Sequence, residues 1–271
     1  MNQQTEEISF LGHLNILRKH IIRSVIAILI ITIIAFCNKE FIVDDVLFAA
    51  KNPHFITYRF FCYLGELLHS SDLCINKINF VIQSRDLASQ FNAHIQISVW
   101  AGFIGASPYI IWEFWRFIKP GLHESEQKSI SGITFFLALL FLLGVLFGFF
   151  LIMPLSIQFL SSYIISEQVL NEIDLNSMVS TVMTTTLTTG IAFELPIVIF
   201  FLAKLGLVNS TFLKKYRKHA IIVILILSAI ITPPDVVSQC LVAIPLVLLF
   251  EISIIIAKRI EPKTRTIIRN N

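Results

Sequence analysis

The stretch TTLTTGIAFELPIVIFFLAKLG at residues 185–206 decides the class of fold that this chain adopts. It is long enough to cross a bilayer and nearly all apolar, although Glu194 lies close to its middle. An ionised carboxylate in hydrocarbon costs roughly 2.5–3.5 kcal/mol or more, and such residues usually face a protein interior or a water-filled cavity. The stretch therefore predicts a membrane span that turns a polar group toward the inside of a helical bundle.

The composition of the whole chain supports the same conclusion. Of its 271 residues, 55% are hydrophobic and only 14% are charged, whereas soluble domains carry about 25% charged residues. The net charge of +3 is too weak to indicate nucleic-acid binding. We therefore expect an all-α, polytopic membrane protein with six spans, of which the fifth and sixth are short. The predicted spans cover residues 21–37, 91–112, 130–151, 178–203, 220–231 and 237–257.

The distribution of basic residues supports the short fifth span and orients the chain. With six spans, sixteen of the 21 lysine and arginine residues fall on one side of the membrane. The loop at 154–176 and the turn at 232–236, on the opposite side, contain none. Cytoplasmic loops carry an excess of Lys and Arg, so both termini are predicted to be cytoplasmic and the long loop at 38–90 external.

Four segments carry strings that apolar bias alone does not generate. They are FLGHLNILRKHI at 10–21, SPYIIWEFWRFIKPGLHESEQK at 107–128, AFELPIVIFFLAKLGLV at 192–208 and ITPPDVVSQCLVAIPLVLLFEI at 231–252. These segments resemble motifs of the TatC family, the multi-spanning receptors of the twin-arginine protein translocase. They occur along this chain in the same order as in the family. The resemblance implies one membrane domain over residues 1–271, in the bacterial inner membrane, with an ordered external first loop.

The resemblance also implies a function. A TatC-like protein is a receptor without enzymatic activity, cofactor or metal, in a translocase that uses the proton motive force. It binds the twin-arginine signal peptides of folded precursors and recruits single-span TatA- and TatB-type subunits into a multi-copy complex. Membrane lipids are its other expected contacts, and nucleic acid is not.

The signal-peptide site is expected at the cytoplasmic ends of the first two spans. Guanidinium groups bind carboxylates through bidentate, charge-assisted hydrogen bonds. By residue type alone, the favoured interpretation is that Glu124 and Glu126 balance nearby lysines or begin the third span, where Glu is favoured. The family motif assigns Glu126 to arginine recognition, and the site implied by the resemblance also includes Leu14, Arg18 and Phe117.

One position departs from the family motif. Ile16 stands where the N-terminal motif has a second acidic residue. Either Glu6 or Glu7 substitutes for it, or Glu126 acts with Glu124, or this protein reads signal peptides less stringently.

Glu194 has two interpretations. It might be neutral and bond a neighbouring helix, because Pro196 frees a backbone carbonyl one turn earlier. Intramembrane polar contacts average only about 0.6 kcal/mol, which is too little to offset ionisation. A polar recess for a partner helix explains the residue better, and the resemblance adds Thr232 and Gln239 to this docking site.

Further residues are expected to have structural roles. Asp235 can cap the sixth span by accepting its free N–H groups, and Pro108 is expected to kink the second span. Glu251 is either a buried helix–helix contact, which we favour, or an interfacial residue. Cys62 and Cys74 both fall in the external loop, where a disulfide is plausible. Pro53 and Pro120 match the family pattern in the first loop and in the turn after the second span.

A rival function is a proton-coupled secondary transporter with Glu194 as its coupling carboxylate. Such transporters usually show two related halves, and this chain has no internal repeat. Motifs of nucleotide-binding loops, nucleophilic serines and zinc proteases are also missing from the sequence.

Overall fold

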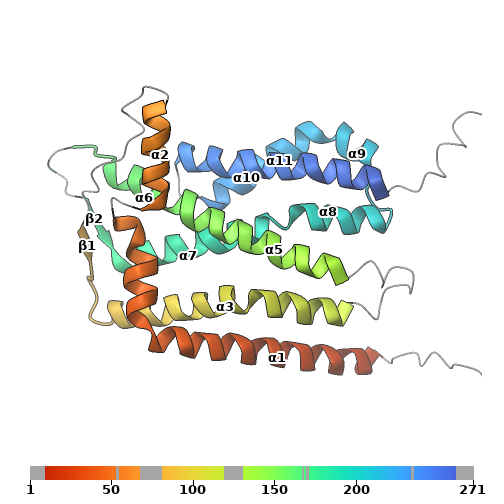
Figure 1. Cartoon of the computed structure of the whole chain (residues 1–271), viewed down its shortest axis with the longest axis horizontal. Coiled ribbons are helices and arrows are strands. Elements are labelled where there is room, and N and C mark those ends of the chain that lie inside the picture. Colours follow the sequence, from red (N-terminus) through yellow and green to blue (C-terminus); the bar gives the residue numbers. More distant parts are fainter. Residues whose placement is uncertain are drawn as a thin grey trace, which may run out of the picture. The chain divides into compact units, whose positions relative to one another are not determined.

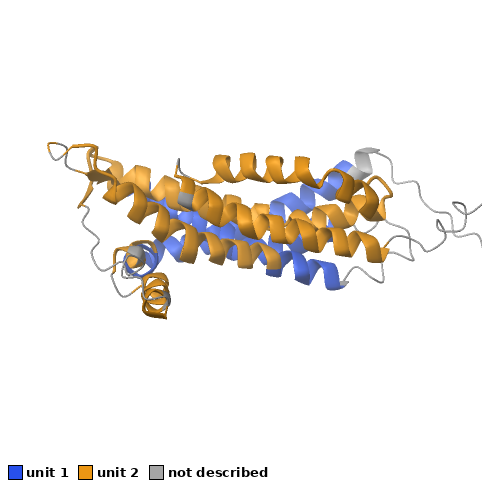
Figure 2. Cartoon of the chain, turned by 90° about the horizontal axis from the view of Figure 1, so that it is seen from above, with its two compact units in different colours: residues 1–46, 91–139 blue, residues 47–90, 140–271 orange. Residues whose placement is uncertain are grey.

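A computed structural model describes residues 10–52, 55–67, 81–118, 131–166, 168, 171–232 and 235–260. The chain divides into two compact units (Figure 2). Unit 1 contains residues Met1–Val46 and Phe91–Leu139, and unit 2 contains Leu47–Gln90 and Leu140–Asn271.

The described chain is almost entirely helical (Figure 1). Its first part holds α1 (Phe10–Cys37), the π-helix η1 (Phe41–Val46), the 3-10 helix η2 (Leu47–Lys51), α2 (Ile56–Leu67), β1 (Val81–Gln83) and α3 (Ser89–Ile118). The middle holds α5 (Ser131–Phe147), the π-helix η5 (Gly148–Ile152), α6 (Met153–Ser162), β2 (Glu172–Asp174), α7 (Leu175–Ala192) and α8 (Leu195–Lys204). The chain continues through α9 (Ser210–Lys215), α10 (Arg217–Ile231) and α11 (Val236–Ile260).

Unit 1 is built on the close approach of α1 and α3. A Cβ atom on Gly102 would lie 2.0 Å from the hydroxyl of Thr32 and 3.0 Å from the carbonyl oxygen of Ile28. Only glycine therefore permits this spacing, as in other membrane helix pairs, where small residues let backbones approach. Farther along the pair, the His94 ring stacks on Phe36 at 4.1 Å, and its Nε2 lies 3.1 Å from the Phe36 carbonyl oxygen.

Unit 2 holds the larger apolar core. Its buried side chains come from η5, α8, α9, α10 and α11, with Val242, Leu246 and Phe250 of α11 at the centre. A second close contact joins α5 to α7, where a Cβ on Gly144 would lie 2.8 Å from the Cα of Gly190. These two glycines bring α5 against the end of α7, next to Glu194.

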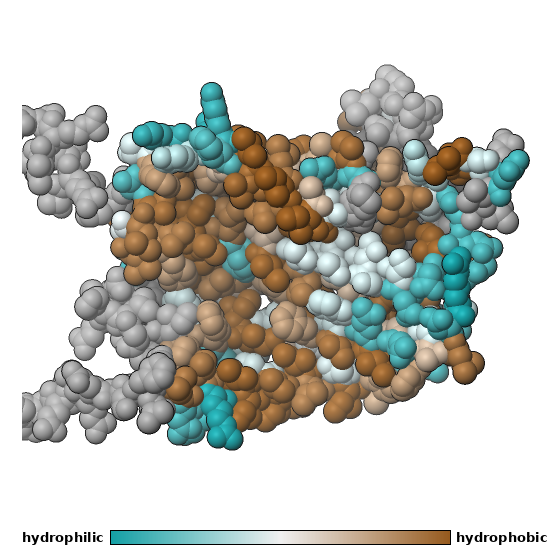
Figure 3. Space-filling view, turned by 180° about the vertical axis from the view of Figure 1, so that it is seen from behind, coloured by the Kyte–Doolittle hydropathy of each residue, from teal (hydrophilic) through white to brown (hydrophobic). Residues whose placement is uncertain are grey.

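The described residues include five helical stretches that are long and apolar enough to cross a membrane. They are Leu14–Cys37, Ser89–Phe117, Gly132–Ser162, Leu175–Lys204 and Ser238–Ile260. Apolar side chains cover much of the face shown in Figure 3, and hydrophilic ones gather toward the helix ends. The 15 residues of α10 fall short of a full crossing, so the count of six spans stays a prediction. The expectation that the sixth is short is wrong, because α11 has 25 residues.

The prediction of an external loop at 154–176 is also wrong for the first part of that range. Helix continues through η5 and α6 as far as Ser162. Pro154 has no N–H group to bond the Phe150 carbonyl one turn earlier, and the Thr57 hydroxyl donates to that carbonyl instead.

The described part of the first loop is ordered around α2. The Thr57 hydroxyl donates a hydrogen bond to the carbonyl oxygen of Phe150, and Phe55 stacks on Phe150 with ring centroids 5.7 Å apart. Tyr58 is buried, and burial raises the pKa of its hydroxyl to about 12. These contacts pack α2 against η5 and the start of α6.

A two-stranded parallel sheet adds to the all-α fold that the sequence predicts. β1 pairs with β2 in the register Val81 with Glu172 and Gln83 with Asp174. The first loop is thereby tied to the segment that precedes α7. Helix α7 then begins at once, because the Asp174 side chain accepts hydrogen bonds from the N–H groups of Asn176 and Ser177.

Cys62 in α2 is disulfide-bonded, whereas Cys37 and Cys240 are free. Cys74 lies outside the described residues, so its pairing with Cys62 stays a prediction. Pro53 also lies outside them.

The predicted orientation can be tested with single cysteines in a background without Cys37 and Cys240. Ile165 follows α6 and is 88% exposed, and Lys215 ends α9 and is exposed. We expect Ile165→Cys to react with an impermeant maleimide in intact cells, because it follows the third span on the side without basic residues.

Lys215→Cys is the matched control and should react only after permeabilisation. The reverse pattern would show that the chain lies in the membrane the other way round.

Candidate functional site

The first part of the site lies in unit 1, at the beginning of α1 and the end of α3. Leu14 and Arg18 are exposed and lie one turn apart on one face of α1. Phe117 lies in the last turn of α3, and its ring packs edge-on against His20 with centroids 6.1 Å apart. His20 of α1 thus joins Phe117 to α1, whereas Leu14 and Arg18 lie on another face of that helix. Glu126, the fourth residue predicted to bind the signal peptide, and Pro120 lie outside the described residues.

The same place contains a buried carboxylate that the sequence analysis missed. Glu113 of α3 is 1% exposed. Its Oε2 is hydrogen-bonded to Nδ1 of His20, and its Oε1 accepts a hydrogen bond of 2.8 Å from the Tyr109 hydroxyl. The guanidinium of Arg23 lies 3.9 Å from Oε1. Both oxygens are therefore satisfied from within α1 and α3.

This cluster explains how a carboxylate is tolerated so close to the membrane. A buried charge needs both a counter-charge and hydrogen bonds. Tyr109 supplies one bond from the previous turn of α3, and α1 supplies the histidine and the arginine. Glu113 consequently fixes the register of α1 against α3 at the end where Leu14, Arg18 and Phe117 lie. A glutamate within the apolar string IIWEFW was the signal that could have revealed it.

We predict that Glu113→Ala destabilises the protein by about 3–5 kcal/mol, the usual cost of removing one partner from a buried charged pair. Glu113→Gln should lose less, because its amide oxygen still accepts from Tyr109. Thermal unfolding in detergent would measure both changes.

Glu251→Gln is the matched control. Glu251 forms an ion pair with Arg217 of α10, but the two side chains are 31% and 56% exposed. Exposed pairs contribute about 0–1 kcal/mol, so this variant should unfold close to the wild type. Equal losses in Glu113→Ala and Glu251→Gln would contradict the assignment of Glu113.

The second part of the site lies in unit 2, where the fourth predicted span is broken. Helix α7 ends at Ala192, and α8 begins at Leu195 with Glu194 at its N-cap and Pro196 in its first turn. Pro196 has no N–H group to donate into α7. The Thr189 hydroxyl bonds back to the Thr185 carbonyl at 2.7 Å, a contact that often bends helices. The break places Glu194 where two helices meet.

The carboxyl group of Glu194 contrasts with that of Glu113. Both of its oxygens are buried, and neither accepts a hydrogen bond of ordinary geometry from any described residue. The backbone of Phe141 in α5 is close enough to interact with it. The hydroxyl of Thr186, in the preceding helix α7, is likewise buried without a described hydrogen-bond partner. Buried polar groups of this kind are rare and call for an explanation.

Thr232 and Gln239 lie together at the end of α10 and the start of α11. The Thr232 hydroxyl donates to the Ser228 carbonyl at 2.9 Å, and Gln239 Nε2 donates to the Leu225 carbonyl at 3.2 Å. Asp235 accepts from the N–H of Ser238 at 2.6 Å, as a helix cap does. Among the described residues, no hydrogen bond joins Thr232 or Gln239 to Glu194. Thr232 and Gln239 bond to α10 and not to Glu194, and their common docking site with Glu194 stays a prediction.

Pro108 lies inside α3, which continues through it to Ile118. No group of three or more His, Cys, Asp or Glu among the described residues is arranged to hold a metal ion.

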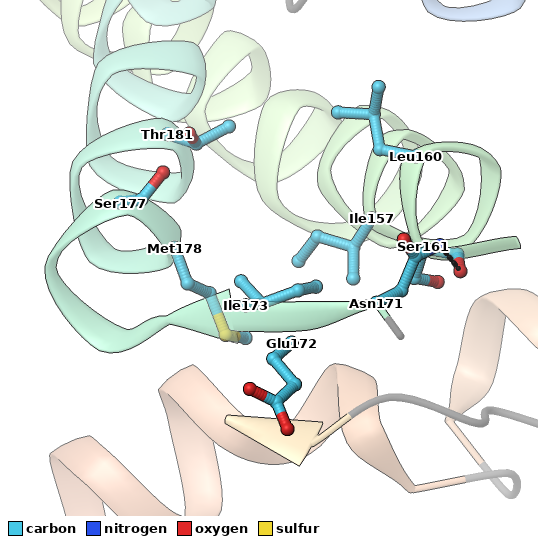
Figure 4. A pocket seen from close by; sticks show the side chains of 9 residues that line it. All are labelled: Ile157, Leu160, Ser161, Asn171, Glu172, Ile173, Ser177, Met178 and Thr181. Atoms are coloured by element: carbon cyan, nitrogen blue, oxygen red, sulfur yellow. Dashed lines mark hydrogen bonds between the residues drawn. The ribbon is translucent and has the colours of Figure 1, made fainter. Parts of the chain in front are cut away.

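A cavity of about 240 Å³ opens between α6, β2 and the start of α7 (Figure 4). Ile157 and Leu160 of α6 face Ile173 and Met178 across it, and Ser161, Ser177 and Thr181 supply hydroxyl groups. The Asn171 amide closes one side by donating to the carbonyls of Ser161 and Tyr163. The described residues predicted to bind the signal peptide or partner subunits do not line this cavity.

Comparison with known proteins gives one consistent result. A family model described as the Sec-independent protein translocase protein TatC matches residues 12–245. The TatC of a Blattabacterium from Periplaneta americana is 43% identical over 265 residues, which cover 97% of this chain and 100% of that protein. The TatC of Carboxydothermus hydrogenoformans is 36% identical and covers 93% of each chain.

Solved structures agree with the sequences. A crystal structure of the twin-arginine translocase receptor TatC is similar to this chain with a TM-score of 0.64 at 33% identity. The similarity covers 92% of this chain and 100% of that one. A second crystal structure of the same receptor, in the detergent DDM, gives a TM-score of 0.65 at 34% identity.

Proposed function

The chain belongs to the TatC family of Sec-independent protein translocases, and from this premise we propose that it binds twin-arginine signal peptides and recruits single-span partner subunits. It acts as a receptor in the bacterial inner membrane, with both termini in the cytoplasm and six spans. It works in several copies with TatA- and TatB-type subunits to export folded precursors at the expense of the proton motive force.

The observation that carries the proposal is the junction of α1 and α3 around Glu113. It supports a signal-peptide site because it joins the beginning of α1, where Leu14 and Arg18 are exposed, to the end of α3, where Phe117 contacts His20. The carboxylate of Glu113 already has three side-chain partners. It therefore does not replace the acidic residue of the family motif that is missing at Ile16. Arginine recognition therefore depends mainly on Glu126.

Recruitment of partners is supported by the unsatisfied carboxyl group of Glu194. A polar group in hydrocarbon needs a partner within the protein or the complex. Since the described residues offer none of ordinary geometry, a polar side chain of an incoming single-span helix is the natural partner. The break between α7 and α8 gives that helix access.

The test of signal-peptide binding is Glu126→Ala. The pair of a carboxylate with a guanidinium is worth about 1.5–3 kcal/mol, or one to two decades of affinity. We expect crosslinking of a twin-arginine precursor to a photoreactive residue at Leu14 to fall by that factor. Leu14 suits the probe because it is 44% exposed.

Two controls accompany this test. Glu124→Ala removes a neighbouring carboxylate and should leave crosslinking near the wild-type level, and a precursor with paired lysines should crosslink poorly to every variant. Copurification of the partner subunits should be unchanged in Glu126→Ala. Wild-type crosslinking in Glu126→Ala would refute the assignment.

Glu194 should behave differently, because it lies in the other unit. In Glu194→Ala we expect precursor crosslinking at Leu14 to persist while partner copurification and export decline. Glu194→Gln should be milder, since its amide can still hydrogen-bond a partner. Glu172→Ala, which removes an exposed carboxylate from β2, is the control and should export normally. Loss of precursor crosslinking in Glu194→Ala alone would overturn this division of roles.

A further inference from the structure

A compact group of basic and aromatic side chains covers Glu113 on the outside of the α1–α3 pair. Its members are Arg23 of α1 and Tyr109, Trp112 and Arg116 of α3, and we refer to them as the Arg23–Arg116 cluster. The rings of Tyr109 and Trp112 lie 5.7 Å apart, and the guanidinium of Arg116 lies over the Trp112 ring at 5.3 Å. Both guanidinium groups are close enough to the Tyr109 hydroxyl to act on it electrostatically.

All four side chains are accessible in the described structure. Tyr109 is 38% and Trp112 45% exposed, the Arg23 side chain is 50% exposed, and Arg116 is also exposed. Of the described residues, Glu113 supplies a counter-charge to Arg23 at 3.9 Å but forms no hydrogen bond with either arginine. It is buried, its oxygens already bond His20 and Tyr109, and Arg23 stays 3.9 Å away, beyond hydrogen-bond distance. With the described residues, the cluster therefore keeps two guanidinium groups with unused donors.

The charge of the cluster decides what it can bind. It repels the paired arginines of a signal peptide, so it is separate from the proposed precursor site. Two guanidinium forks suit an anion with several oxygens, and phosphate is the group that they bind bidentately.

The position of the cluster decides where the phosphate comes from. α1 and α3 are both apolar enough to cross a membrane. Trp and Tyr concentrate at the headgroup level of a bilayer, where the ring meets acyl chain and the polar edge meets water. Basic side chains beside such rings extend along them toward the headgroups. An exposed Tyr–Trp pair against two arginines thus matches a phospholipid, with the phosphate on the arginines and the upper acyl chain along the rings.

We propose that the Arg23–Arg116 cluster is a binding site for the phosphate of an anionic phospholipid, in the leaflet at this end of α1 and α3. Phosphatidylglycerol or cardiolipin fits this site, whereas a zwitterionic lipid carries an ammonium group that the arginines disfavour. The bound lipid would cover the outside of the Glu113 contact and hold α1 on α3.

Native mass spectrometry of the full chain tests the proposal. Protein in a neutral detergent is titrated with phosphatidylglycerol, cardiolipin or phosphatidylcholine, and the lipid-bound fractions are compared. We expect wild type to retain the anionic lipids in preference to phosphatidylcholine. Arg23→Gln with Arg116→Gln should weaken anionic-lipid binding by at least about tenfold, because two charge-assisted contacts are lost.

Matched variants separate this site from general surface charge. Lys214→Gln with Lys215→Gln removes the same charge from unit 2. There the ammonium group of Lys215 lies 5.9 Å over the Tyr216 ring, and no guanidinium group of a described residue lies over that ring. This pair should bind the anionic lipids like wild type. Arg23→Lys with Arg116→Lys should fall between, since it keeps the charge and loses the bidentate geometry.

The outcomes are distinct. Equal lipid loss in the two double glutamine variants, or equal binding of phosphatidylcholine, would overturn the proposal. If inorganic phosphate at millimolar concentration displaces the lipid from wild type, the cluster recognises a free anion and the lipid assignment is wrong. Unchanged thermal unfolding of the arginine variant in lipid-free detergent would show that the loss is one of binding and not of folding.

Discussion

A carboxyl group in apolar surroundings must find its hydrogen bonds inside the protein or its complex, because hydrocarbon supplies none. This chain meets that constraint in two opposite ways. Glu113 receives a histidine, a tyrosine and an arginine from α1 and α3, which makes it a structural joint. Glu194 is buried at a helix break without an ordinary hydrogen bond, which leaves it suited to a partner that arrives later. The structural role of Glu113 and the proposed docking role of Glu194 therefore differ in how many hydrogen bonds each carboxyl group receives within the chain.

Close helix approach makes both arrangements possible. Gly102 lets α1 and α3 come near enough for His20 to reach Glu113, and Gly144 with Gly190 does the same for α5 and α7 beside Glu194. A methyl group at any of these positions would meet neighbouring atoms at 3.0 Å or less. Membrane helices gain little from burying apolar surface against one another, so such packing contributes much of their attachment.

The sequence predicted the five long apolar helices because apolar length is a strong local signal, and it located Glu194 because a carboxylate stands out in such a stretch. It did not predict the pairing of Glu113 with His20, since 93 residues separate them and no local pattern records that contact. The continuation of helix through Pro154 was missed because the hydrogen bond from Thr57 to the Phe150 carbonyl, one turn before the proline, comes from a residue far away in the sequence. The hydrogen bonds of Thr232 and Gln239 to α10 were also not predicted, because no local pattern records which carbonyl a side chain reaches.

The polar end of α10 limits what chemistry a partner can bring there. Gln239 uses its Nε2 on the Leu225 carbonyl, and Thr232 uses its hydroxyl proton on the Ser228 carbonyl. Thr232 therefore has only oxygen lone pairs left to offer, whereas Gln239 keeps its amide oxygen and the second N–H of Nε2. Thr232 is buried whereas Gln239 is half-buried, so an approaching helix meets the Gln239 oxygen first. A partner that docks at Thr232 must present a hydrogen-bond donor, whereas at Gln239 it can donate to the amide oxygen or accept from the remaining N–H without breaking the Gln239–Leu225 bond.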